Sequence, residues 1–333
     1  MALNQLNQVV GVLAKEEADY GVAETLSNSA DGINIYIGDG DPPAPEAYEY
    51  VFDGNIGRAS GSLAPQKRTT PNGRFRSGSL QVLPKGLGAA YTTSSVTPPR
   101  EVHRMMKAAG FDATFVTDHW EYTPTAHGTG FESLTLRQFS QGSQYDQAGV
   151  ICDMSFETQG LGVPVMTFAW RGVASLPSDQ SLPSITVLAP SVIAPVAAGI
   201  TLTIGAYTDA VVRRVAYRSN RNVETARINQ LLAGGHAGFV PGGMMPELEI
   251  EIERPLRSTF DPEAELAAAT ARALTLTFDD GGTANNWGLE MPQAQLASVT
   301  PGGEGALATV TLVYRAYAST PTANDFLTFT WGA

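Results

Sequence analysis

The segment Glu247-Leu-Glu-Ile-Glu-Ile-Glu253 alternates glutamate with an aliphatic residue over its whole length. In a β-strand, successive side chains point to opposite faces, so the aliphatic residues share one face and the glutamates share the other. We expect the aliphatic face to be buried, because unpaired carboxylates are too costly to bury. The stretch therefore predicts a strand with one core face and one face of carboxylates. We call these carboxylates the glutamate row: Glu247, Glu249, Glu251 and Glu253.

Similar near-alternating runs recur along the chain, and clusters of Gly, Pro, Asp and Asn between them supply turns. They cover residues 133–139, 165–170, 202–204, 274–278, 310–314 and 326–331. Helix signals are fewer. Residues 99–110 carry an apolar stripe, with Thr97 as the expected N-cap and Gly110 as the stop. Residues 261–272 open with Asp-Pro-Glu, which suits a helix N-terminus, and residues 223–232 are a weaker candidate. The sequence predicts a mainly β protein.

The two predicted helices have similar surroundings, since a long loop and a strand precede each of them and three strands follow. In the first half these are the loop 58–76, the strand 77–83 and the strands 131–139, 149–159 and 163–172. In the second half they are the loop 218–243, the strand 247–253 and the strands 273–278, 287–299 and 306–317. We interpret this as a diverged duplication of one unit, joined near residues 182–195. It predicts two domains, residues 1–185 and 186–333.

Composition excludes several classes of protein. The 333 residues include 33 acidic and 21 basic side chains, a net charge of −12 that argues against gripping nucleic acid phosphates. The single cysteine, Cys152, cannot form an internal disulfide. The N-terminus lacks the features of a signal peptide, and the longest apolar run, residues 192–206, is interrupted and too short for a membrane span. We therefore expect a soluble protein that is made in a reducing cytoplasm.

Motifs for catalysis are missing from the sequence. It contains no phosphate loop, dinucleotide fingerprint, His-Glu-x-x-His motif or nucleophile elbow. None of the four histidines has a second histidine or a cysteine at metal-ligand spacing; they are His103, His119, His127 and His236. Asp118-His119 is the best acid–base candidate, and an exposed pair explains it more simply. The sequence therefore predicts no enzymatic activity, no cofactor and no metal site.

Several short segments resemble one known family. Gly11-Val-Leu-Ala-Lys-Glu-Glu-Ala-Asp-Tyr-Gly21 is similar to the start of the major tail tube proteins of long-tailed, siphovirus-type bacteriophages. The segment Arg100-Glu-Val-His-Arg-Met-Met-Lys-Ala-Ala-Gly-Phe111 is similar to a helix of that family. The match continues in order through Tyr122-Thr-Pro124, Phe131-Glu-Ser-Leu-Thr-Leu136, Gly149 and Met166-Thr-Phe168.

The resemblance implies tandem tail-tube-like domains, each a β-sandwich or barrel with one flanking α-helix and a long hairpin loop. Copies in that family form rings that stack into a tube, the conduit for DNA ejection. We therefore expect a virion protein, made in the host cytoplasm, that assembles with itself and meets tape measure, tail terminator and distal tail proteins. DNA would pass without specific binding, and no membrane is involved. Three chains would close a pseudo-sixfold ring; the alternative is six. The competing function is a tail-tip or fibre adhesin that binds a host glycan.

Two groups of residues are candidates for the function. The glutamate row and the matching polar positions of the first half, Ser77, Ser79 and Gln81, are expected to line the lumen; the alternative is a strand on the exterior of the tube. A cluster of cations in the loop 58–76 is expected to contact the next ring; the alternative is a solvated loop. Its members are Arg58, Lys67, Arg68, Arg74 and Arg76.

Overall fold

The computed structural model describes residues 9–35, 50–52, 69–71, 75–125, 132–140, 142–159, 162–187, 195, 199–221, 225–228, 236–240, 242–279, 285–320 and 323–332. Within these residues the chain forms nineteen strands and two helices, which confirms the prediction of a mainly β protein. The elements of the first half are β1 (Val9–Glu16), β2 (Tyr50–Phe52), β3 (Thr69–Pro71), β4 (Phe75–Val82), α1 (Arg100–Ala108), β5 (Phe111–Val116), β6 (His119–Pro124), β7 (Leu134–Ser140), β8 (Ser143–Gln159), β9 (Val165–Ala174) and β10 (Ser178–Asp179). Those of the second half are β11 (Ile200–Ile204), β12 (Val212–Arg218), β13 (Thr225–Ile228), β14 (His236–Val240), β15 (Glu247–Glu253), α2 (Pro262–Ala268), β16 (Ala271–Phe278), β17 (Trp287–Glu304), β18 (Leu307–Ala316) and β19 (Thr328–Trp331).

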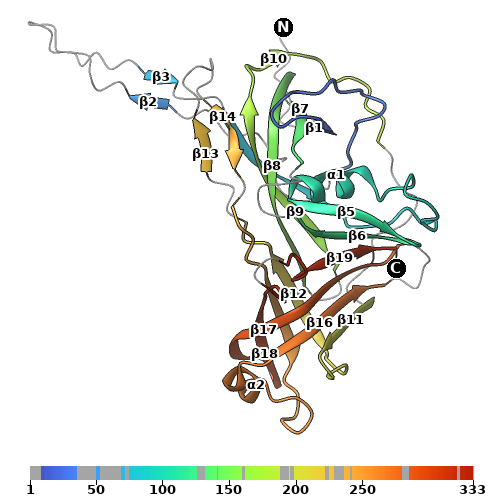
Figure 1. The fold of residues 1–333 in the computed structure, drawn as a ribbon, viewed down its shortest axis with the longest axis vertical. Coiled ribbons are helices and arrows are strands. Elements are labelled where there is room, and N and C mark those ends of the chain that lie inside the picture. The colour runs from blue at the N-terminus through green and yellow to red at the C-terminus, as the bar shows by residue number, and fades with distance from the viewer. Residues whose placement is uncertain are drawn as a thin grey trace, which may run out of the picture.

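Two five-strand units have the same strand order. In the first half, neighbouring strands follow the order β4-β9-β8-β7-β1, and in the second half the order β15-β18-β17-β16-β11. In both units the helix follows the first-named strand along the chain, and all pairings are antiparallel. A duplication of one unit would produce this shared order. Figure 1 shows the units arranged lengthwise, the first half above and the second below.

The two units belong to one sheet of fifteen strands. Strand β12 pairs with β8 of the first half and with β15 of the second, and β19 pairs with β17 and with β6. The hydrophobic core is also shared: Phe156 of β8 lies edge-on to Trp287 of β17, with ring centroids 5.2 Å apart, and stacks on Tyr217 of β12 at 5.5 Å. The division at residues 185 and 186 therefore separates two strand units that are joined by pairing and by core contacts.

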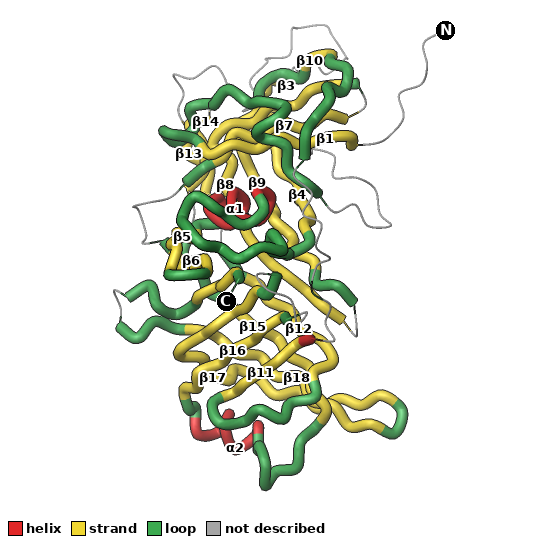
Figure 2. Tube along the Cα trace, turned by 90° about the vertical axis from the view of Figure 1, so that its right-hand side faces the viewer, coloured by secondary structure: helices red, strands yellow, loops and turns green. Residues whose placement is uncertain are grey.

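Helix α1 covers the core of the first half, and α2 lies at the far end of the second half (Figure 2). Helix α1 buries Val102, Met105 and Met106 and stops before Gly110, whose φ of +80° suits glycine. The predicted N-cap was wrong: Pro99 holds that position, and no side chain caps the helix. Its fixed φ and the carbonyl of Pro99, which accepts from Val102 and His103, start the helix instead.

The second predicted helix is shorter than expected. Asp261 caps it as predicted, by accepting a hydrogen bond from the Ala264 amide at 3.2 Å. The helix ends at Ala268 rather than at residue 272, because Ala269 adopts a left-handed conformation and β16 begins at Ala271. The weak helix candidate at residues 223–232 was wrong, since β13 lies there and pairs with β14 in a hairpin. In both cases pairing between strands outweighs a modest helix propensity.

Candidate functional site: the open face of the sheet

The candidate site is the face of the sheet that turns away from the hydrophobic core, which we call the open face. Directly opposed residues of antiparallel strands lie on the same face. The register opposes Gln81 to Thr167, Thr167 to Ser155, Ser155 to Arg218 and Arg218 to Glu247. One row of side chains therefore runs from β4 through β9, β8 and β12 to β15. The structure thus brings the predicted polar positions of both halves onto one face.

The strand that carries the glutamate row has the predicted orientation. Leu248, Ile250 and Ile252 of β15 are completely buried, while the four glutamates between and around them are half-buried on the open face. The prediction of a strand with one core face is confirmed.

The strand registers of the two halves can be aligned with each other. Strand β9 opposes Gly78 to Trp170 and Leu80 to Phe168, as β18 opposes Leu248 to Tyr314 and Ile250 to Leu312. When Trp170 of β9 is aligned with Tyr314 of β18, polar residues of β4 align with members of the glutamate row on β15. Ser77, Ser79 and Gln81 then occupy the places of Glu247, Glu249 and Glu251.

Arginines from neighbouring strands compensate the glutamate row. Arg214 of β12 lies between Glu157 of β8, whose Oε1 is 2.9 Å from its Nε, and Glu249 of β15. Arg218 Nη1 lies 3.6 Å from Glu249 Oε2. The hydrogen bond to Glu157 is the main cause that raises the pKa of Arg214.

Two further glutamates of the row have partners. Arg315 of β18 binds Glu247 at 2.7 Å, and Arg213 lies 3.8 Å from Glu253. Glu251 makes no ion pair with any residue that the structure describes. Arginines thus pair with three of the four glutamates, which reduces the repulsion that four like charges along one strand would cause. The open face carries mixed charge.

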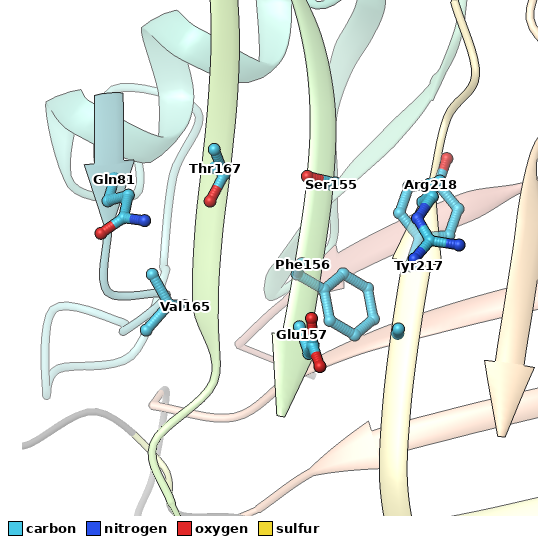
Figure 3. A pocket seen from close by; sticks show the side chains of 9 residues that line it. Gln81, Ser155, Phe156, Glu157, Val165, Thr167, Tyr217 and Arg218 are labelled. Carbon is cyan, nitrogen blue, oxygen red and sulfur yellow. The ribbon is translucent and has the colours of Figure 1, made fainter. Parts of the chain in front are cut away.

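A depression of about 250 Å³ lies in the open face where the strands of the two halves meet. Figure 3 shows its side chains rising from β4, β9, β8 and β12. Its polar lining includes Gln81, Thr167, Ser155, Glu157 and Arg218. This lining has no cysteine and no histidine.

Of the cations in the loop 58–76, Arg76 alone lies within the described residues. Arg58, Lys67, Arg68 and Arg74 lie outside the described residues. Arg76 lies within β4, and its side chain is only 3 % exposed, with its guanidinium carbon 4.6 Å from the centre of the Tyr145 ring. Its side chain lies on the same, core-facing side of β4 as those of Leu80 and Val82. The prediction that Arg76 reaches out from a loop to another ring was wrong.

Two residues of the N-terminal segment, Glu17 and Tyr20, make hydrogen bonds to distant parts of the chain. The buried carboxylate of Glu17 accepts hydrogen bonds from Ser133 Oγ at 2.5 Å, Thr135 Oγ1 at 2.9 Å and the amide of Gly149 at 2.9 Å. The hydroxyl of Tyr20 accepts from the amide of Phe239 at 2.6 Å and lies 2.8 Å from its carbonyl. Phe239 belongs to β14, so Tyr20 ties the second-half hairpin to the first half.

Sequence reasoning missed the role of β12. The stretch Val212-Arg-Arg-Val-Ala-Tyr-Arg218 places Arg214 and Arg218 on one face and Val215 and Tyr217 on the other. This alternation was a usable signal for a strand with a cationic face. Its partner strands could not be found from the sequence, because both are distant along the chain.

The candidates for chemistry elsewhere have structural explanations. His103 Nδ1 lies 2.8 Å from the Tyr122 hydroxyl, and burial, with Lys107 nearby, lowers the pKa of His103 to about 4. His119 lies between Asp118 and Glu121, at 3.0 and 3.2 Å. Cys152 is fully buried, which raises its pKa. His127 and the side chain of His236 lie outside the described residues.

The described ranges carry neither a metal-ion cluster nor a membrane-spanning helix. Their side chains contain no group of His, Cys, Asp and Glu arranged to hold a metal ion. Neither of the two described helices has the length and apolar run that a membrane span needs. No protein-family model matches the chain, and no curated protein sequence matches it significantly.

Proposed function

We propose that this chain is the structural subunit of a phage tail tube, and that the open face lines the lumen through which DNA is ejected. The observation that carries the proposal is the continuous row from Gln81 to Glu247. It places polar side chains of both halves on one face, opposite the shared core. A sheet that separates a water-filled lumen from a protein layer needs one polar face and one apolar face.

The charges of the open face fit a conduit for DNA. The arginines Arg214, Arg218 and Arg315 are engaged by carboxylates of the same face, which leaves them less able to hold phosphates. A net charge of −12 on the chain also repels the DNA backbone. DNA would slide past such a wall without specific binding.

Each five-strand unit with its helix would be one tail-tube-like domain, residues 1–185 and 186–333. The protein would be made in the host cytoplasm and reside in the virion, with itself, tape measure, tail terminator and distal tail proteins as partners. The proposed function requires no cofactor.

Negative-stain electron microscopy of the purified chain tests the function directly. Hollow filaments of uniform width are expected at high protein concentration. Discrete trimers without a lumen would favour the adhesin instead, and monomers at all concentrations would contradict both.

A further inference from the structure

Two glutamines lie in the core of the first half, at the end of β8 that is far from β12. Gln138 of β7 is completely buried, and Gln147 of β8 is 1 % exposed. Gln138 is opposed to Val12 of β1, and Gln147 is opposed to Leu136 of β7. Val12 and Leu136 belong to the hydrophobic core, so both glutamines face the core as well.

The two glutamines are diagonal neighbours on adjacent strands. The register opposes Gln138 to Tyr145 and Leu136 to Gln147. Diagonal positions of an antiparallel pair lie about 7–8 Å apart, within reach of long side chains. The side-chain amides of Gln138 and Gln147 can therefore approach each other on the core face.

Neither side-chain amide has a hydrogen-bond partner among the residues that the structure describes. The unpartnered atoms are Nε2 and Oε1 of both Gln138 and Gln147. A glutamine amide carries two N–H donors and one acceptor oxygen, and buried polar atoms are nearly always hydrogen-bonded, either to protein or to ordered water. Two such amides on neighbouring strands indicate a ligand that donates and accepts hydrogen bonds at once.

The surroundings of the two amides are polar on one side. Tyr145 is opposed to Gln138, and the guanidinium carbon of Arg76 lies 4.6 Å from the centre of the Tyr145 ring. Arg76 is opposed to Gly172 of β9, which has no side chain, so the arginine can pass over β9 to reach β8. A site next to a phenol ring and a buried guanidinium suits water better than it suits an apolar ligand.

We propose that Gln138 and Gln147 form a buried water site, in which ordered water bridges the two side-chain amides. A water molecule donates two hydrogen bonds and accepts two, so it can bind Oε1 of one glutamine and Nε2 of the other. Buried water commonly satisfies polar groups that have no protein partner in this way. The bridge adds a side-chain link to the backbone pairing of β7 with β8. It also favours the observed register, because a slip of one residue would turn a glutamine to the opposite face.

A double-mutant cycle tests the bridge. Methionine is an unbranched side chain of similar length that lacks the amide. Gln138→Met or Gln147→Met alone leaves the water and the remaining amide with too few partners, and should raise the unfolding equilibrium constant at least about fivefold. The double variant removes both amides, so its effect should be clearly smaller than the product of the two single effects. Urea unfolding measures all four proteins.

The matched control for the cycle is Gln180→Met. Gln180 is exposed, and its backbone amide donates to the carbonyl of Gly142, so it lies at the same end of the first half. This variant should change the unfolding equilibrium constant by less than about twofold. Single variants of Gln138 and Gln147 that are each more stable than the wild type, with effects that multiply, would overturn the bridge. They would show that the amides are buried dry, since their removal would then relieve a desolvation cost.

Crystallography of the wild-type protein gives a second measurement that needs no variant. Electron density for water is expected about 2.7–3.2 Å from an amide atom of each glutamine. Direct hydrogen bonds from both amides to the chain, or two amides in contact without water, would overturn the site. The site lies within one chain, so neither measurement depends on whether the protein forms a tube.

Discussion

At the scale of single residues, Arg214 is the most informative side chain of the molecule. It binds Glu157 from the first half and Glu249 from the second, so one guanidinium connects both halves on the open face. Arginine suits this place because its planar donors serve two carboxylates at once. Glu249 is engaged by Arg214 and Arg218, so replacing it with lysine would disturb the contact between β12 and β15 as well as the charge of the open face.

Glu251 is the better residue for testing the lumen. It makes no ion pair within the described residues, so Glu251→Gln should leave the free energy of unfolding within about 0.5 kcal/mol of the wild type, whereas Glu251→Lys, which places a second cation opposite Arg214, should cost more. The new cation should attract phosphates and slow DNA ejection from assembled particles, measured as the rate of DNA release. Glu251→Gln, which adds no cation, is the control and should eject at nearly the normal rate. Equal ejection rates for both variants would contradict a position in the lumen.

His103 predicts a pH dependence of stability. Its folded-state pKa of about 4 lies below the ordinary 6.5, because burial, with Lys107 and Arg104 nearby, outweighs the attraction of Glu16. The unfolded chain therefore takes up a proton as the pH falls through 6.5, while the folded chain does so only near 4, and stability is lost across that interval. The resulting loss in the free energy of unfolding should reach about 1–3 kcal/mol at pH 4. Urea unfolding of the wild type and of His103→Gln checks it, and parallel pH profiles for the two proteins would contradict it.

At the scale of elements, β12 decides how the halves are joined. Ala216 is opposed by Glu157 on one side and Glu249 on the other, so its amide points toward a paired strand whichever way it faces. Ala216→Pro removes that donor and should cost at least about 1–3 kcal/mol. Chemical unfolding measures the loss, and Ala216→Gly, which keeps the amide, should cost clearly less. A proline variant as stable as the glycine variant would show that β12 is not paired on both edges.

The elements also show where sequence reasoning succeeds and where it stops. The strand of the glutamate row was predicted because alternation is a local pattern with one buried face. The core-facing position of Arg76 could have followed from its parity with Leu80, but the loop was assumed to extend through it. The pairing of β12 with β8 and β15, and with it the neutralisation of the glutamate row, depends on strands about 60 and 35 positions away, for which no local pattern exists. The helix predicted for residues 223–232 was wrong for a similar reason, since the pairing of β13 with β14 decides the structure there.

At the scale of the whole molecule, the repeated strand order predicts the symmetry of the assembly. If each copy supplies two equivalent units, three copies present six units around the axis, so the ring should have true threefold and pseudo-sixfold symmetry. Cryo-electron microscopy of filaments measures this from layer lines and from the reconstruction. True sixfold symmetry, with residues after 195 at the outer rim, would contradict the arrangement of three copies.

In the proposed tube, strand β12 would also affect the thermodynamics of assembly. A joint made within one chain forms when the chain folds, at an effective concentration set by the connecting peptide rather than by the number of free subunits. In the proposed ring of three copies, three of the six boundaries between units would lie within a chain and would be closed before two molecules meet. Only three encounters then have to overcome the loss of translational and rotational freedom, against six for a ring of single units. If the chain forms rings as proposed, joining two units in one chain would lower the subunit concentration at which rings form, and it would prevent rings with an odd number of units.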